Sequence, residues 1–148
     1  MSPAVRLQIQ YGSSYGRSVR QKTVALLQRG QMDNLKVSVS GWSEFSAEPY
    51  QLNSNLWTSR VFELCKVVGH ILPETPSRDQ GVAGRYAVCH AEKQLVAYYW
   101  YRHSTYEKKR TLHVSRQPCE DCVLFLRQVK NVLGLSVRVI VNGTRVPY

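Results

Sequence analysis

Apolar and polar side chains alternate along residues 5–11, 35–40 and 135–141, which is the pattern of strands with one buried face. Residues 111–115 predict a further short strand. Asn142-Gly143 follows the last of these stretches and is a turn signal. We therefore expect at least three strands, with an extended arm as the alternative for residues 5–11.

Apolar residues recur at helical spacing in four other stretches, which are residues 18–28, 56–71, 90–103 and 118–133. Ser54 or Asn55 is suited to cap the second helix, and Gly134 is suited to end the fourth. The expected inward positions are Val19, Thr23, Ala25, Leu26 and Leu27 in the first helix; Val61, Leu64, Cys65, Val68 and Leu72 in the second; Leu95, Val96 and Tyr99 in the third; and Val123, Leu126, Val129 and Leu133 in the fourth.

The remaining stretches, residues 43–53, 73–84 and 105–110, are polar, charged or rich in helix breakers and predict loops. Helices alternate with strands in the second half of the chain, and this order predicts an α/β fold with a layered sheet. We expect a single domain over residues 1–148, with its core at about 35–142 and an N-terminal strand and helix extension at 1–30.

The chain has 148 residues and a formal net charge of +10. This excess favours polyanionic partners, and thus a polynucleotide over a free nucleoside, although basic charge can also serve solubility. No run of 18 apolar residues is present, and residues 1–20 lack the apolar core of a signal peptide. We expect no membrane partner and an intracellular location, in cytoplasm or nucleus; a monomer is plausible.

Two short motifs supply one imidazole, two thiols and a carboxylate: His90-Ala91-Glu92 and Pro118-Cys119-Glu120-Asp121-Cys122. Catalytic zinc takes three nitrogen or sulfur ligands and keeps a fourth position for water. His90, Cys119 and Cys122 are the predicted ligands, and two thiols in the first turn of a helix are favoured as thiolates. Glu92 lies two residues after His90, so its carboxylate is placed to move protons. A structural zinc site would not need this carboxylate.

Each half of this pattern is far less specific when taken alone. A C-x2-C pair is also found in zinc ribbons, redox pairs and buried cores. Cys89 adjoins His90, but neighbouring side chains point in different directions, so we do not expect it to share the ion. The remaining thiols, Cys65 and Cys89, need no partner, which fits a reducing compartment.

The stretches Gly84–Tyr99 (GRYAVCHAEKQLVAYY) and Val114–Cys122 (VSRQPCEDC) resemble the cytidine-deaminase superfamily, and within it the DYW-like nucleic-acid deaminases with their fungal and bacterial-toxin relatives. The resemblance covers roughly residues 56–141. It implies a cytidine deaminase-like mixed sheet of five strands flanked by helices in three layers, zinc on His90, Cys119 and Cys122, and Glu92 as the proton shuttle. The chain ends in Val146-Pro147-Tyr148 instead of Asp-Tyr-Trp. It also stops after the fourth family strand, unless an N-terminal segment fills the sheet edge.

Several residues near the two motifs are candidates for substrate contact. Arg78, Arg85 and Tyr86 precede His90, and Arg116 and Gln117 precede Pro118. Such side chains hold phosphates or stack an unpaired base, although each could also be a plain surface residue.

The other aromatic and basic clusters have weaker links to the site. Trp42 is either a core residue or a pocket wall, whereas Trp57 is expected in the core. The four aromatics at residues 98–101 point around a helix in several directions, so most should serve packing. The basic residues 108–110 follow the far end of the helix that begins at His90. We expect them in a solvated loop distant from the metal.

These observations lead to one main hypothesis: a zinc-dependent deaminase that converts cytosine to uracil in a polynucleotide, with DNA favoured over RNA. Zinc hydroxide would attack C4 of the base while Glu92 relays the proton. The alternatives are a deaminase of free cytidine or nucleotide, an adenine-specific nucleic-acid deaminase, and a catalytically silent nucleic-acid-binding module stabilised by zinc. A delivered toxin domain is compatible with the main hypothesis.

Overall fold

A computed structural model describes residues 22–29, 32–42, 51–102 and 110–148. Its centre is a five-stranded sheet in the order β2-β1-β3-β4-β5. The β3 and β4 strands are parallel, and the other neighbours are antiparallel. The strands are β1 (Val24–Arg29), β2 (Met32–Val39), β3 (Arg110–Val114), β4 (Val137–Val141) and β5 (Thr144–Val146).

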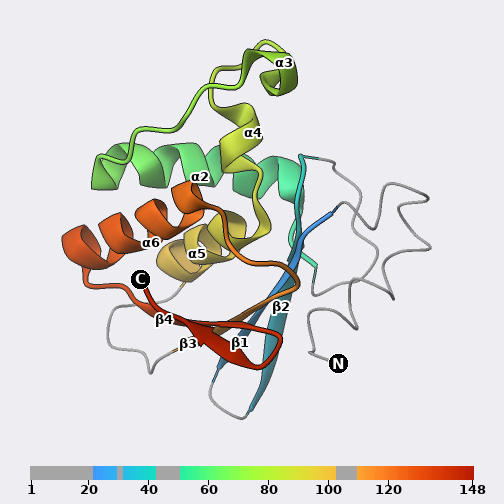
Figure 1. Cartoon of the computed structure of the whole chain (residues 1–148), viewed down its shortest axis with the longest axis vertical. Helices are drawn as coiled ribbons and strands as arrows, with labels where there is room; N and C mark the ends of the chain where they lie inside the picture. Colours follow the sequence, from blue (N-terminus) through green and yellow to red (C-terminus); the bar gives the residue numbers. More distant parts are fainter. Residues whose placement is uncertain (1–21, 30–31, 43–50, 103–109) are drawn as a thin grey trace.

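Three long helices pack together on the same face of this sheet (Figure 1). The helices are α2 (Ser54–Val68), α5 (Ala91–Arg102) and α6 (Glu120–Leu133), with the short α3 (Pro76–Asp79) and α4 (Arg85–Val88) between α2 and α5. The mixed sheet, its flanking helices and the single small domain confirm the predicted fold class. The described helices do not form a third layer. None of the described helices is both long and apolar enough to cross a bilayer.

The α6 helix connects the parallel strands β3 and β4. A crossover of this kind begins beyond the carboxyl end of the first strand, so the N-terminus of α6 lies at that edge of the sheet. The α5 helix packs against β1, β2 and α6. The fold thus brings the first turns of α5 and α6 together at one end of the molecule.

Burial along β1 corrects the prediction of a helix at residues 18–28. Val24, Ala25, Leu26 and Leu27 are all buried, so both faces of β1 are covered. β1 is an interior strand, paired with β2 along one edge and with β3 along the other. A strand covered on both faces shows an unbroken apolar run and no alternation, and a short run of this kind cannot be distinguished from a buried helix by periodicity. Residues 5–11 and Val19 lie outside the described residues.

Helix α2 begins slightly earlier than predicted, with Asn53 as its cap: the Asn53 side chain accepts from the backbone N–H of Leu56 at 3.0 Å. The predicted loop at residues 73–84 contains the short helix α3.

The end of the chain also differs from the prediction. After the Asn142-Gly143 turn the chain adds β5, which pairs with β4 and completes a sheet of five strands. The fifth position is therefore filled from the C-terminal side.

Arg110 corrects a further expectation. It is the first residue of β3, only 2 % exposed, and its guanidinium lies 5.3 Å from the centre of the Tyr99 ring. Residues 108 and 109 lie outside the described residues. The expected buried positions of α2 and α5 are confirmed except Leu72, which is half-buried. In α6, Cys122 and Phe125 are buried whereas Val123 and Leu133 are only partly buried.

Candidate metal centre

His90, Cys119 and Cys122 converge at the edge where α5 and α6 begin. Their ligand atoms all lie within 4.8 Å of one another. The Nδ1 atom of His90 is 3.2 Å from the Cys122 sulfur and 3.4 Å from the Cys119 sulfur. Nitrogen and sulfur atoms around a tetrahedral zinc ion are separated by roughly 3.3–3.8 Å, given the usual zinc–ligand bond lengths. One imidazole and two thiols at these separations fit such an ion with one ligand position left over.

Cys119 is held by the start of α6. It is the N-cap residue, and its sulfur accepts a hydrogen bond from the backbone N–H of Cys122 at 3.4 Å. The hydrogen bond with the Cys122 side chain lowers the pKa of the Cys119 thiol and, together with His90, outweighs the opposing effect of burial, so that this pKa is about 3. The same hydrogen bond and burial raise the pKa of Cys122 well above its usual value. One of the two sulfurs is therefore a thiolate at neutral pH without further help.

Glu92 lies in the first turn of α5 and is 3 % exposed. Its Oε1 atom is buried and has no hydrogen-bond partner among the described residues. An unpaired buried carboxylate oxygen is costly and therefore rare in a folded protein. Its negative charge contributes to the raised pKa of Cys122, after the hydrogen bond with Cys119 and burial. The carboxylate is thus near the thiols and has an acceptor site to spare.

A polar network behind the three side chains was missed by sequence reasoning. Lys93 of α5 donates to Asp121 of α6 and, at 2.6 Å, to the backbone oxygen of Ala87. The other carboxylate oxygen of Asp121 lies 2.9 Å from Nε2 of His70. Burial tends to lower the pKa of Lys93, but the charge of Cys122 and the hydrogen bond with Asp121 raise it, so the amine stays protonated. The only signal in the sequence was a charged residue beside the first motif and another inside the second, and such residues are equally typical of a solvent-exposed surface.

A cavity of about 550 Å³ opens beside His90. Its walls come from four segments of the chain: residues 22–23, residues 40–42, side chains between 78 and 90, and Arg116. We call it the metal-side cavity. Its size falls within the range of small-molecule pockets, roughly 300–1,000 Å³. Of the predicted contact residues, Trp42, Arg78, Tyr86 and Arg116 line the cavity. The contribution of residues 22–23 and 40–41 was not predicted.

Aromatic rings and guanidinium groups line or border this cavity in stacked pairs. Arg78 donates to the Tyr86 hydroxyl at 2.8 Å and lies 5.0 Å from the centre of that ring. The Tyr86 ring in turn meets the His90 ring edge to face at 5.5 Å. Arg85 is not part of the lining but lies 4.8 Å above the Trp42 ring. Gln117 is exposed and outside the lining.

Asp79 positions the segment that carries Tyr86. Its carboxylate is buried and accepts from the backbone N–H groups of Thr75, Gly84 and Tyr86 at 2.8, 3.1 and 2.9 Å. Burial alone would raise the pKa of Asp79, but these three hydrogen bonds lower it below the usual value. A single side chain therefore fixes the turn between α3 and α4.

Gln94 connects the cavity wall at the end of β2 to Cys89, the residue before His90. Its Nε2 atom donates to the backbone oxygens of Val39, Gly41 and Cys89, at 3.1, 3.3 and 3.0 Å. The backbone N–H of Gly41 also donates to Cys89, at 3.0 Å. The Cys89 thiol points to the backbone oxygen of Tyr86 at 3.1 Å. The end of β2 and the start of α5 are thus held as one unit.

The other two described histidines and Trp57 have packing or structural roles. His113 is hydrogen-bonded to Gln28 at 3.1 Å, and His70 belongs to the Lys93 network. Trp57 is buried in the core, as predicted, and packs edge to face with Tyr98 and Tyr101. His103 lies outside the described residues.

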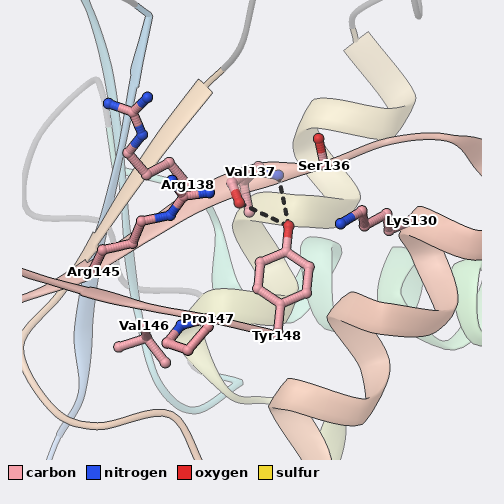
Figure 2. A pocket seen from close by; sticks show the side chains of 8 residues that line it. All are labelled: Lys130, Ser136, Val137, Arg138, Arg145, Val146, Pro147 and Tyr148. Carbon is pink, nitrogen blue, oxygen red and sulfur yellow. Dashed lines mark hydrogen bonds between the residues drawn. The ribbon is translucent and has the colours of Figure 1, made fainter.

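A second cavity, of about 270 Å³, lies at the opposite end of β4 (Figure 2). We call it the Tyr148 cavity. The Tyr148 hydroxyl accepts from the backbone N–H of Val137 at 2.8 Å and donates to its oxygen at 2.7 Å. Lys130 lies beside the Tyr148 ring, whereas Arg138 and Arg145 extend away from it. The cationic groups do not converge, and none of the four motif side chains lines this cavity.

Residues 37–96 match a protein-family model described as "Single-strand DNA deaminase toxin A, C-terminal". The matched segment includes His90 and Glu92 and runs from β2 into α5, whereas Cys119 and Cys122 lie beyond it. No curated protein matches the chain. The family match and the His/Cys/Cys group, which could hold a metal ion, together support a nucleic-acid deaminase similar to bacterial DNA deaminase toxins.

Proposed function

We propose that this protein is a zinc-dependent deaminase that converts cytosine to uracil in single-stranded DNA. The observation that carries the proposal is the meeting of His90, Cys119 and Cys122 beside the unpaired carboxylate of Glu92, next to a cavity of suitable size. The description of the matching family motivates the choice of single-stranded DNA. The net charge of +10 agrees with a polyanionic substrate.

His90, Cys119 and Cys122 would hold the zinc ion. When bound, zinc acidifies a water molecule and so supplies a nucleophile at neutral pH. Three protein ligands leave room for that water, as in catalytic rather than structural zinc sites. The buried position of Cys122 excludes bulk water from one side of the group.

Glu92 would act as the proton carrier. Its free oxygen has no competing partner among the described residues, so it can accept a proton from the attacking water. It would then deliver protons to N3 of the ring and to the departing amino group. The overall reaction adds water at C4 of cytosine and releases ammonia, leaving uracil. The carboxylate must be deprotonated before the attack and protonated after it, which a general base does.

The metal-side cavity would receive the unstacked base. Tyr86 and Trp42 offer aromatic surfaces for stacking, and Lys22, Arg78 and Arg116 line the same space with positive charge. Stacking is tolerant of sequence, and positive charge follows the backbone, which together suit a single strand. Arg85, above the Trp42 ring, would hold that wall in place, and Gln117 would reach a flanking nucleotide.

Incubation of the zinc-loaded protein with single-stranded DNA, duplex DNA, RNA and free cytidine tests this proposal. Sequencing or uracil excision reads out the polynucleotides, and chromatography reads out cytidine. The expected result is C-to-T change in single-stranded DNA and far less in the others. A-to-G change would indicate an adenine deaminase, and reaction of cytidine alone a nucleoside deaminase. Binding of DNA without any product would indicate a nucleic-acid-binding module that zinc only stabilises.

A further inference from the structure

The ion pair between Lys93 and Asp121 is buried at the junction of α5 and α6. The Lys93 side chain is 0 % exposed and that of Asp121 is 18 % exposed. Lys93 also donates to the backbone oxygen of Ala87, just before α5, and Asp121 also holds His70 from beyond the end of α2. Four segments of the chain therefore meet at one cation and one carboxylate.

One partner adjoins the first motif and the other lies inside the second. Lys93 follows Glu92 directly and lies one helical turn after His90, and Asp121 lies between Cys119 and Cys122. The ion pair thus joins the first turn of α5 to the first turn of α6. Any shift of one helix against the other would change both the ion pair and the separation of the His90 nitrogen from the two sulfurs.

Stability alone does not account for this arrangement. A buried ion pair often contributes no more than an apolar pair of the same volume, because both charges lose their hydration. The surroundings give a more specific reason. Two thiols and the carboxylates of Glu92 and Asp121 converge here, and Lys93 interacts electrostatically with both thiols. A buried cation offsets the repulsion that would otherwise push α5 and α6 apart.

We propose that Lys93 and Asp121, anchored by His70, are positioning residues that fix the separation of His90 from Cys119 and Cys122 and so set the geometry of the metal centre. The inference rests on the proposed function in taking zinc as the bound ion. The pair contacts neither substrate nor metal; it acts through the two helices. Partners of this outer kind alter metal affinity by about 10–100-fold when removed.

The test uses the full chain with Lys93→Met, which keeps the length of the side chain without its charge, and Asp121→Asn, which keeps its shape. Lys130→Met, an exposed lysine on the same helix α6, is the matched control. Zinc affinity is measured by competition with a chromogenic chelator, and the visible spectrum of the Co²⁺-loaded protein reports ligand geometry. Circular dichroism and thermal unfolding establish that each variant is folded.

We expect Lys93→Met and Asp121→Asn to weaken zinc binding by about 10–100-fold and to alter the Co²⁺ spectrum, while Lys130→Met changes neither. The double variant should lose little more than either single variant, because the two residues act as one pair. On single-stranded DNA, kcat should fall while KM stays near that of the unsubstituted protein.

Folded variants with unchanged zinc affinity and an unchanged Co²⁺ spectrum would overturn the inference. If Lys93→Met does not fold, Asp121→Asn decides by the same two measurements. If the unsubstituted protein deaminates DNA and the variants bind zinc normally, the inference is wrong and the proposed function stands. If the unsubstituted protein binds zinc but deaminates nothing, and the variants bind zinc weakly, the proposed function is wrong and the inference stands.

Discussion

The metal-side cavity and the Tyr148 cavity lie at opposite ends of the same parallel strands, and they differ in how their polar groups are used. At the Tyr148 cavity the partly buried hydroxyl forms hydrogen bonds with both backbone groups of Val137, and the cationic side chains diverge. At the metal end, a carboxylate oxygen of Glu92 is buried without a partner among the described residues. Three side chains that could hold a metal ion also converge there, and two guanidinium groups lie over aromatic rings.

Of these two cavities, only the one beside the candidate ligands also has the unpaired buried oxygen of Glu92 near it. An unpaired atom is not sufficient by itself, since Nδ1 of His113 in β3 also has no partner among the described residues. A folded protein pairs its buried polar groups unless another requirement intervenes. The Tyr148 end obeys that rule, since its hydroxyl is paired with the N–H and the carbonyl of Val137. The metal end departs from it, at the carboxylate that the proposed chemistry needs. Substitutions at either end can therefore test this contrast.

The largest effect should come from Glu92→Gln, which keeps the shape of the side chain and removes its ability to carry a proton. We expect deamination of single-stranded DNA to fall by at least about 10²–10⁴-fold, the usual contribution of a general acid–base. Zinc content and thermal stability should be retained, because no partner among the described residues loses a hydrogen bond to Oε1. Single-turnover uracil formation measures the rate. Activity close to that of the unsubstituted protein would refute the role of Glu92.

Removal of the metal should have the next largest effect. Zinc at one hundred times its dissociation constant should stabilise the folded state by about 2.7 kcal/mol, and chelation should reverse this gain together with the activity. Cys122→Ala should lose the zinc-dependent increase in melting temperature, since the buried sulfur is a predicted ligand. Differential scanning calorimetry with and without zinc measures it. Cys65→Ala, which changes a buried thiol outside the group, is the control.

Asp79→Asn should have a smaller, pH-dependent effect. The pKa of Asp79 is lowered in the folded protein by the backbone hydrogen bonds that outweigh burial, so the carboxylate stabilises the fold above its unfolded pKa of 3.8. That contribution is lost as the pH falls through the folded pKa. The unsubstituted protein should therefore be more stable than the variant at pH 6, and the difference should shrink toward pH 3. Urea unfolding at several pH values measures it; a constant difference would contradict the assignment.

Tyr148→Phe should have the smallest effect. It removes the hydroxyl that bridges the N–H and carbonyl of Val137 and should cost about 1 kcal/mol in the free energy of unfolding, measured by urea denaturation. Deamination should be unchanged, because the Tyr148 cavity shares no lining residue with the metal-side cavity. A loss of activity in a stably folded variant would show that the two ends are coupled.

Local pattern in the sequence was sufficient for much of the architecture. Periodicity located α2 and α6 and the strands β3 and β4, because each has one buried face. It also located α5 and β2, although residues 91–97 and 37–39 are buried without interruption. The paired motifs also predicted that His90 would meet Cys119 and Cys122, since the chemistry of zinc allows few other uses of that residue set. These conclusions needed only the local order of residues along the chain and the preference of zinc for nitrogen and sulfur ligands.

What depends on contacts between distant segments was decided by the tertiary structure. The interior strand β1 is buried on both faces, so its sequence carries no alternation to show it. The cavity wall at residues 22–23 and 40–42 is brought to His90 by sheet pairing and by Gln94, and no local signal marks it. Lys93 and Asp121 look like ordinary surface charges until α5 and α6 pack together. The sequence by itself determined which groups could bind a metal; only the packing of these helices decided how far apart they lie and which charge is buried between them.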